Sequence, residues 1–170
     1  MSAAQTPDYF DKARSIAAAV MVAAAMAAVI GSLLDWVSIE PPAIVPVAQE
    51  NQLEPFTGIE VNDGWVTAIA GILVMAFAAL LVTRRRALWA ALAFICSMVI
   101  GAVAVADYRG IQQIAYDEMN RIGEVRPGVG LTLVAAAGFI GLIAAAAGVA
   151  ATPRRDREEA SADSDHPLDR

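Results

Sequence analysis

Residues 129–151 read VGLTLVAAAGFIGLIAAAAGVAA, a run of apolar and small residues without a charged side chain. An α-helix of about 20 such residues is long enough to cross the hydrocarbon core of a bilayer. Three more stretches of the same kind precede it, at residues 15–34, 65–83 and 87–106. The chain is 58% hydrophobic, above the ~45–50% typical of soluble domains. The sequence therefore predicts an all-α membrane protein, an antiparallel bundle of four transmembrane helices.

The first apolar run also resembles the core of a signal peptide, because Lys12 and Arg14 precede it. The run is longer than the ~7–15 apolar residues usual in such a core. We therefore expect a retained helix, with a cleaved signal peptide as the alternative.

The remaining segments predict the domain layout. We expect a cytoplasmic tail at residues 1–13, a transmembrane domain at 14–152 and a disordered cytoplasmic tail at 153–170, which is polar and lacks aromatic residues. The helices are expected at about 14–35, 64–83, 87–106 and 128–151. Apolar residues at helical spacing, among them Ile111 and Ile114, predict that the third helix continues outside the membrane to about residue 122. The alternative is a separate surface helix after a break at Gly110.

The first loop, between residues 35 and 64, carries four prolines that exclude a regular helix over most of it. We expect it to be irregular or partly β, with residues 37–39 pairing with residues 44–45 or 59–61. Asp63 is expected to cap the second transmembrane helix.

The distribution of basic residues predicts the orientation, because cytoplasmic loops are enriched in Lys and Arg. One side carries Lys12, Arg14, Arg84, Arg85, Arg86, Arg154, Arg155 and Arg157, and the other carries only Arg109, Arg121 and Arg126. Both termini are therefore expected in the cytoplasm of a multi-pass cell-membrane protein. Arg84, Arg85, Arg86, Arg154 and Arg155 are candidates for binding anionic lipid headgroups.

The sequence lacks the residues that several classes of function usually require. The chain has one cysteine, Cys96, and one histidine, His166, so that neither a disulfide within the chain nor a usual zinc or haem site is expected. We find no hydrolase, nucleotide-binding or metalloprotease motif and expect no cofactor and no catalytic residues. Three consecutive arginines do not indicate nucleic-acid binding. No ionisable residue lies at bilayer depth, which argues against a proton-coupled carrier.

Other patterns each admit two interpretations. Ala137, Gly141 and Ala145 repeat at a spacing that lets helices approach closely; they serve either packing within the bundle or docking against a partner. The tryptophans at helix ends form either an interfacial belt or, for Trp36 and Trp65, a ligand platform. Asp35 and Asp107 lie at outer helix ends and either contact Arg109 or Arg126 or remain separately solvated.

Three short motifs carry a resemblance. They are Asp35-Trp36 at the end of the first helix, Asn62-Asp63-Gly64-Trp65 at the start of the second, and Arg126-Pro127-Gly128-Val129-Gly130-Leu131 at the start of the fourth. The pattern resembles a loose group of small four-helix membrane proteins of high-GC Gram-positive bacteria, mostly without assigned activity. Asp35 stands where that group often has proline. The resemblance implies a shared membrane topology and a gathering of the motifs at the outer end of the bundle, where Gly128 and Gly130 would allow close packing.

The leading interpretation is a non-enzymatic accessory or scaffold subunit of a membrane complex. Its partners would be membrane lipids and other integral membrane proteins, or further copies of itself. The first loop, which includes Phe56, is expected to fold over Ile111 and Ile114 and form the interaction surface. The alternatives are a component of a transporter or channel and a lipid-modifying enzyme.

Overall fold

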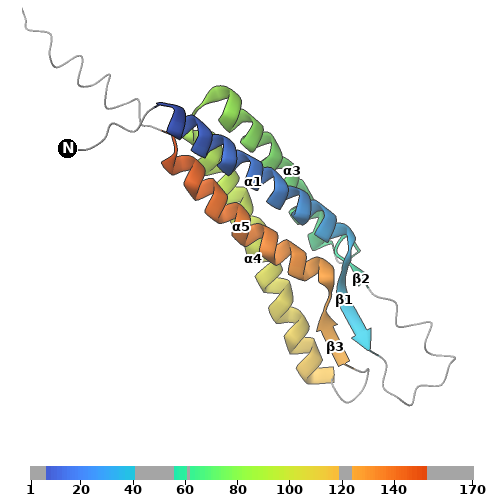
Figure 1. Cartoon of the computed structure of the whole chain (residues 1–170). Helices are drawn as coiled ribbons and strands as arrows, with labels where there is room; N and C mark the ends of the chain where they lie inside the picture. The colour runs from blue at the N-terminus through green and yellow to red at the C-terminus, as the bar shows by residue number, and fades with distance from the viewer. Residues whose placement is uncertain (1–6, 41–55, 61, 119–123, 153–170) are drawn as a thin grey trace, which may run out of the picture.

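The computed structural model of the chain describes residues 7–40, 56–60, 62–118 and 124–152. Four long helices form an antiparallel bundle, as predicted (Figure 1). They are α1 (Pro7–Leu33), α3 (Asp63–Arg84), α4 (Ala87–Glu118) and α5 (Val129–Ala150). All four are long and apolar enough to cross a membrane. The main contacts run around a ring, α1 with α3, α3 with α4, α4 with α5 and α5 with α1.

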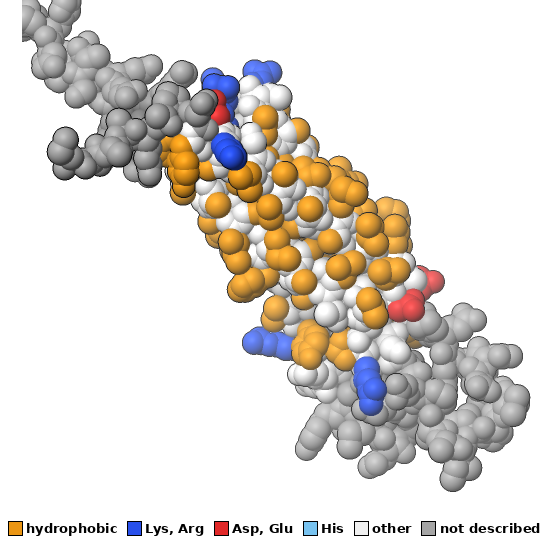
Figure 2. Space-filling model, in the orientation of Figure 1, with side chains coloured by type: hydrophobic (Ala, Val, Ile, Leu, Met, Phe, Trp, Pro, Cys, Tyr) orange, Lys and Arg blue, Asp and Glu red, His pale blue; other side chains and the backbone are white. Residues whose placement is uncertain are grey.

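The bundle places small side chains inside and large ones outside. Buried positions are mostly alanine, whereas isoleucine side chains are exposed on every helix, together with other large hydrophobic side chains. Figure 2 shows hydrophobic side chains over the middle of the visible face and charged side chains at its two ends. A soluble bundle would bury the large residues. The reverse arrangement suits lipid, where helices associate through close packing of small residues.

The second and third spans form a tight hairpin. Arg85 ends α3 in the left-handed conformation, with φ of 53°, and its backbone N–H donates a hydrogen bond to the Leu81 carbonyl at 3.2 Å. Only Arg85 and Arg86 separate the two helices. We call this end of the bundle, where α1 begins and α5 finishes, the termini end.

Helix α4 continues without a break past Gly110, as predicted, and extends to Glu118. At ~1.5 Å per residue the helix is about 48 Å long, well beyond the ~30 Å of a hydrocarbon core. Its far end therefore projects from the membrane. Residues 119–123, which include the rest of the predicted extension, lie outside the described part of the chain.

A small antiparallel sheet lies at the opposite end, which we call the sheet end (Figure 1). Its strands are β1 (Asp35–Glu40), β2 (Phe56–Thr57) and β3 (Glu124–Pro127), in the order β2-β1-β3. Val37 pairs with Phe56 on one side and with Pro127 on the other. Strand β3 also packs against α4.

The sheet corrects part of the predicted loop. Residues 37–39 are in a strand, but their partners are Phe56–Thr57 and Glu124–Pro127. Ile59 and Glu60 form a turn, and residues 44–45 lie outside the described part. The prediction was wrong about Pro127, which lies in β3; Gly128 is the N-cap of α5. Asp63 is likewise not the cap of α3. Asn62 holds the N-cap position without a side-chain cap bond, and Asp63 lies in the first turn.

Candidate functional site at the sheet end of the bundle

Trp36 is the centre of the sheet end. It lies on β1, and only 1% of its surface is exposed. Its indole Nε1 donates a hydrogen bond of 2.9 Å to the Gly31 carbonyl near the end of α1. A buried indole N–H needs such a partner. The ring therefore turns back from the sheet and closes the end of the bundle.

Glycines from three segments allow the backbone to approach Trp36 closely. A β-carbon on Gly58 would stand 2.3 Å from the indole, and one on Gly128 would stand 2.1 Å from the Asp35 carbonyl oxygen. The Gly128 N–H donates a 2.7 Å hydrogen bond to the Trp36 carbonyl. A β-carbon on Gly64 would in turn meet the Gly58 carbonyl carbon at 2.2 Å. No side chain fits at these three positions unless the backbone moves.

The three motifs that carry the family resemblance therefore meet around one tryptophan. Gly130 adds a further close approach, because a β-carbon added there would lie 2.5 Å from the Gly31 carbonyl oxygen. The same oxygen accepts the hydrogen bond from Trp36. The geometry joins the ends of α1, α3 and α5 by backbone contacts.

A buried pair of hydroxyl groups joins α1 to α3 just inside this end. The Ser32 and Thr67 oxygens are 2.6 Å apart. Ser32 also lies within bonding distance of the Ala28 carbonyl, at 2.8 Å, and Thr67 of the Gly64 carbonyl, at 3.0 Å. Two hydroxyls have only two protons to donate, so that one serves the contact between the helices and the other a backbone carbonyl.

Two carboxyl groups lie together at the beginning of α3. The Asp107 carboxyl group of α4 lies close to that of Asp63. Among the described residues, no partner reaches the buried Oδ2 of Asp107. No group of three or more possible metal ligands occurs in the described part of the chain.

The other predicted site residues differ in their exposure to solvent. Asp35, Phe56 and Trp65 are exposed, and Ile111 is buried. Phe56, a residue of the first loop, was expected to be buried against the apolar face of Ile111 and Ile114, and its 50% exposure shows that this expectation was wrong. The α4 backbone includes Ile114, whose side chain is not described. Because Trp36 is buried and Trp65 is exposed, the two rings do not form a common ligand platform.

Gly141 lies away from the sheet end, in the middle of α5. A β-carbon there would be 2.7 Å from the Ser97 hydroxyl oxygen of α4. Ala137 and Ala145 of the same repeat are buried as well. The small-residue repeat of α5 therefore packs within the bundle.

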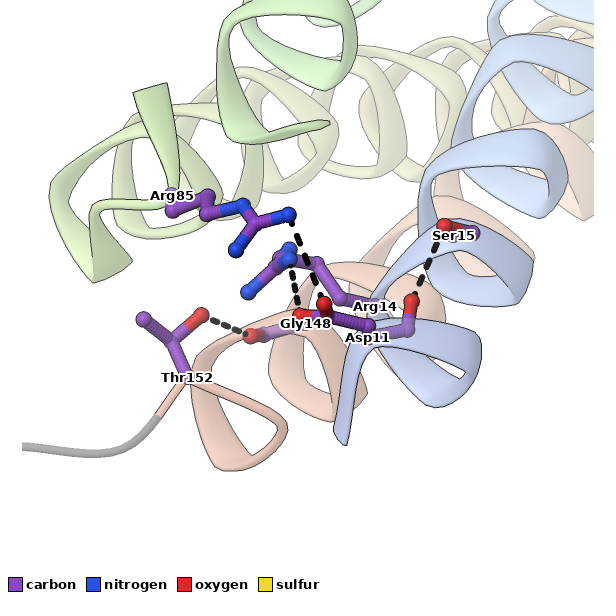
Figure 3. Close-up of polar contacts among 6 residues, drawn as sticks. All are labelled: Asp11, Arg14, Ser15, Arg85, Gly148 and Thr152. Carbon is purple, nitrogen blue, oxygen red and sulfur yellow. Dashed lines mark hydrogen bonds and ion pairs between the residues drawn. The ribbon is translucent and has the colours of Figure 1, made fainter. Parts of the chain in front are cut away.

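An ion-pair cluster at the termini end was missed by the sequence reasoning. Asp11 accepts a hydrogen bond from Arg14, and its other carboxylate oxygen lies 3.4 Å from Arg85 Nη2 (Figure 3). Arg14 is 5% exposed, although it had been assigned only an orienting role. The spacing of three residues between Asp11 and Arg14 is the signal that could have found the pair.

The other candidate lipid-binding arginines are located only in part. Arg84, Arg85 and Arg86 are exposed at the termini end. Arg154 and Arg155 lie outside the described residues.

Comparisons with protein-family models, curated proteins and solved structures found no match to this chain. The structure and composition support an integral membrane protein with four candidate spans.

Proposed function

We propose that this chain is a non-enzymatic accessory or scaffold subunit of a membrane complex, and that it binds its partner through the sheet end. The observation that carries the proposal is a contrast between two surfaces. The small-residue repeat of α5 packs inside the bundle, whereas the sheet end presents exposed aromatic side chains on a fixed support.

The helix faces suit lipid better than a partner helix. On α5 the small residues Ala137, Gly141 and Ala145 point inward, while Phe139 and Ile143 are exposed. Interfaces between transmembrane helices are enriched in small residues. Bulky branched and aromatic side chains on the outer face therefore favour contact with acyl chains.

The surface proposed for binding consists of β1, β2, β3 and α4 from Asp107 onward, and we call it the sheet platform. Strand β3 joins β1 to α4 in it. Phe56 is 50% exposed on β2, and Tyr108 is 44% exposed on the projecting part of α4. Aromatic residues are enriched in protein interfaces. The contacts around Trp36 hold the platform rigidly on the bundle, so that binding would require little further ordering.

The experiment is purification of the tagged full-length chain from its native membrane in mild detergent, followed by identification of the proteins that co-migrate. The test variant carries Phe56→Ser and Tyr108→Ser, and the matched control carries Phe139→Leu on the lipid-facing side of α5. We expect the wild type and the control to retain one partner and the double variant to lose it at unchanged thermal stability. Retention by the double variant would show that the contacts lie elsewhere.

The proposed orientation places the termini end in the cytoplasm. It rests on the excess of Lys and Arg at that end. In a Cys96→Ala background, a membrane-impermeant maleimide added to intact cells should label Gln113→Cys and leave Arg86→Cys unlabelled until the cells are opened. The opposite labelling pattern would reverse the orientation.

A further inference from the structure

A shallow groove runs between α1 and α3 near the termini end, with a volume of about 370 Å³. Alanines form most of it, with Ser15, Ala18 and Ala19 on α1 and Ala78, Ala79 and Val82 on α3. It lies within two candidate membrane spans. Small side chains flanked by larger ones leave a channel along the helices in which an acyl chain can lie.

Polar groups close the groove at the termini end. The Ser15 hydroxyl donates a 2.9 Å hydrogen bond to the Asp11 carbonyl, one turn before it on α1. On the other wall, Arg85 follows Val82 by three residues and pairs with Asp11 across the groove. Ser15 and Val82 of the groove are thus followed, about one helical turn away, by the cluster of Asp11, Arg14 and Arg85. Figure 3 shows this cluster.

This cluster carries excess positive charge. Both carboxylate oxygens of Asp11 are already engaged, one by Arg14 and one by Arg85. Arg14 is buried, but the Arg85 side chain is 66% exposed and has donors left over, because a guanidinium has five N–H groups. Lys12 is exposed on α1, about one helical turn before Ser15 of the groove. A guanidinium and an ammonium group at the end of an apolar groove match a phosphate attached to an acyl chain.

We propose that this groove binds one anionic phospholipid of the leaflet that faces the termini, with an acyl chain between α1 and α3 and the phosphate on Lys12 and Arg85. The proposal is independent of the partner-binding function and rests only on the four membrane spans. Its occupant is a lipid rather than a helix because the groove leads straight into cationic groups, which an apolar helix would not neutralise.

A second groove provides an internal comparison. It lies between α1 and α5, has a volume of about 410 Å³ and is lined entirely by alanine, valine and isoleucine, including Ile16, Ile143 and Ala147. No ion pair described in the structure joins α1 to α5 at its end. Lipid in this groove should therefore show a weaker preference for a charged headgroup than lipid in the first groove.

The test is native mass spectrometry of the full chain released from detergent, titrated with dioleoylphosphatidylglycerol or dioleoylphosphatidylcholine. We expect one phosphatidylglycerol to bind at least about tenfold more tightly than phosphatidylcholine, since each basic residue near a membrane surface adds measurably to anionic-lipid affinity. The double variant Lys12→Gln, Arg85→Gln should lose this preference, and Arg109→Gln at the sheet end should keep it.

A second test fills the groove with a larger side chain. It can be carried out even if the double variant of Lys12 and Arg85 fails to fold. Ala79→Leu should weaken phosphatidylglycerol binding, and Ala147→Leu in the second groove should not. Equal binding of the two phospholipids by the wild type, or unchanged phosphatidylglycerol binding by Ala79→Leu, would overturn the proposal. A dimer that Ala79→Leu dissociates would also overturn it, because the groove would then hold a second copy of the chain.

Discussion

Gly58 lies so close to Trp36 that a β-carbon on Gly58 would stand 2.3 Å from both Nε1 and Cε2 of the indole. The backbone of the segment after β2 therefore rests directly on the ring that closes the bundle. The Gly58 N–H also donates a 3.2 Å hydrogen bond to the Leu34 carbonyl, so the segment has little freedom to move away.

Gly58→Ala should consequently destabilise the protein by about 1–3 kcal/mol, the usual range for overpacking a well-packed site. Thermal unfolding in detergent, followed by tryptophan fluorescence, measures the effect. The matched control is Gly110→Ala, where a β-carbon meets nothing within 4 Å and a helical alanine is favoured over glycine by about 0.5–1 kcal/mol. Equal melting temperatures for the two variants would refute the close contact at Trp36.

The Ser32–Thr67 hydrogen bond should appear as a coupling between the two positions. Ser32→Ala and Thr67→Val should each lower stability, and the double variant should lose less than the sum. Hydrogen bonds between membrane helices average about 0.6 kcal/mol, with a maximum near 1.7, and we expect a coupling energy in that range. A double-mutant cycle from unfolding in mixed detergent measures it, and strictly additive losses would argue against the bond.

Gly141→Leu should separate α5 from α4, because its side chain would have to displace Ser97. The expected loss is at least about 1–3 kcal/mol. The matched control is Ala146→Leu, five residues along the same helix on an exposed face. A buried position such as Ala90, which is 0% exposed and packs near Gly148, would not be a mild control. Similar melting temperatures for Gly141→Leu and Ala146→Leu would place residue 141 against lipid.

Asp11→Asn should destabilise the termini end, because it leaves the buried Arg14 guanidinium without its anionic partner. We expect a loss of about 1–3 kcal/mol, as for other buried groups that lose a hydrogen-bond partner. Adding Arg14→Met should restore much of the stability, since an apolar side chain at the buried position needs no counter-charge. Chemical unfolding of the wild type and the two variants decides this, and a further loss in the double variant would show that Arg14 has another important partner.

Much of the helical architecture was predictable because it depends on local sequence. The run at residues 129–151 is apolar over its whole length, and this local composition is enough to predict a membrane span without knowledge of the segment's neighbours. The same applies to the continuous α4, where the apolar spacing persists beyond Gly110. The antiparallel arrangement of α3 and α4 was also predictable, because only Arg85 and Arg86 connect the two helices.

The candidate site was predictable only in part. The motifs around Trp36, Gly64 and Gly128 were recognised as a group expected at the outer end of the bundle, but the burial of Trp36 and the exposure of Phe56 were not foreseen. Strand β3 was missed because Pro127 was read as the start of a helix. Its pairing with Val37 joins residues far apart in the sequence, and no local pattern specifies such a partner.

The sequence by itself determined that four helices are long and apolar enough to cross a membrane, because the transfer of each apolar segment into lipid depends mainly on the composition of that segment. Only the tertiary structure decided which groups meet. Trp36 with Gly58, Ser32 with Thr67, Asp63 with Asp107 and Arg14 with Asp11 are contacts whose energy depends on distance and burial. Except for the last, they become neighbours only when separate helices and loops pack together.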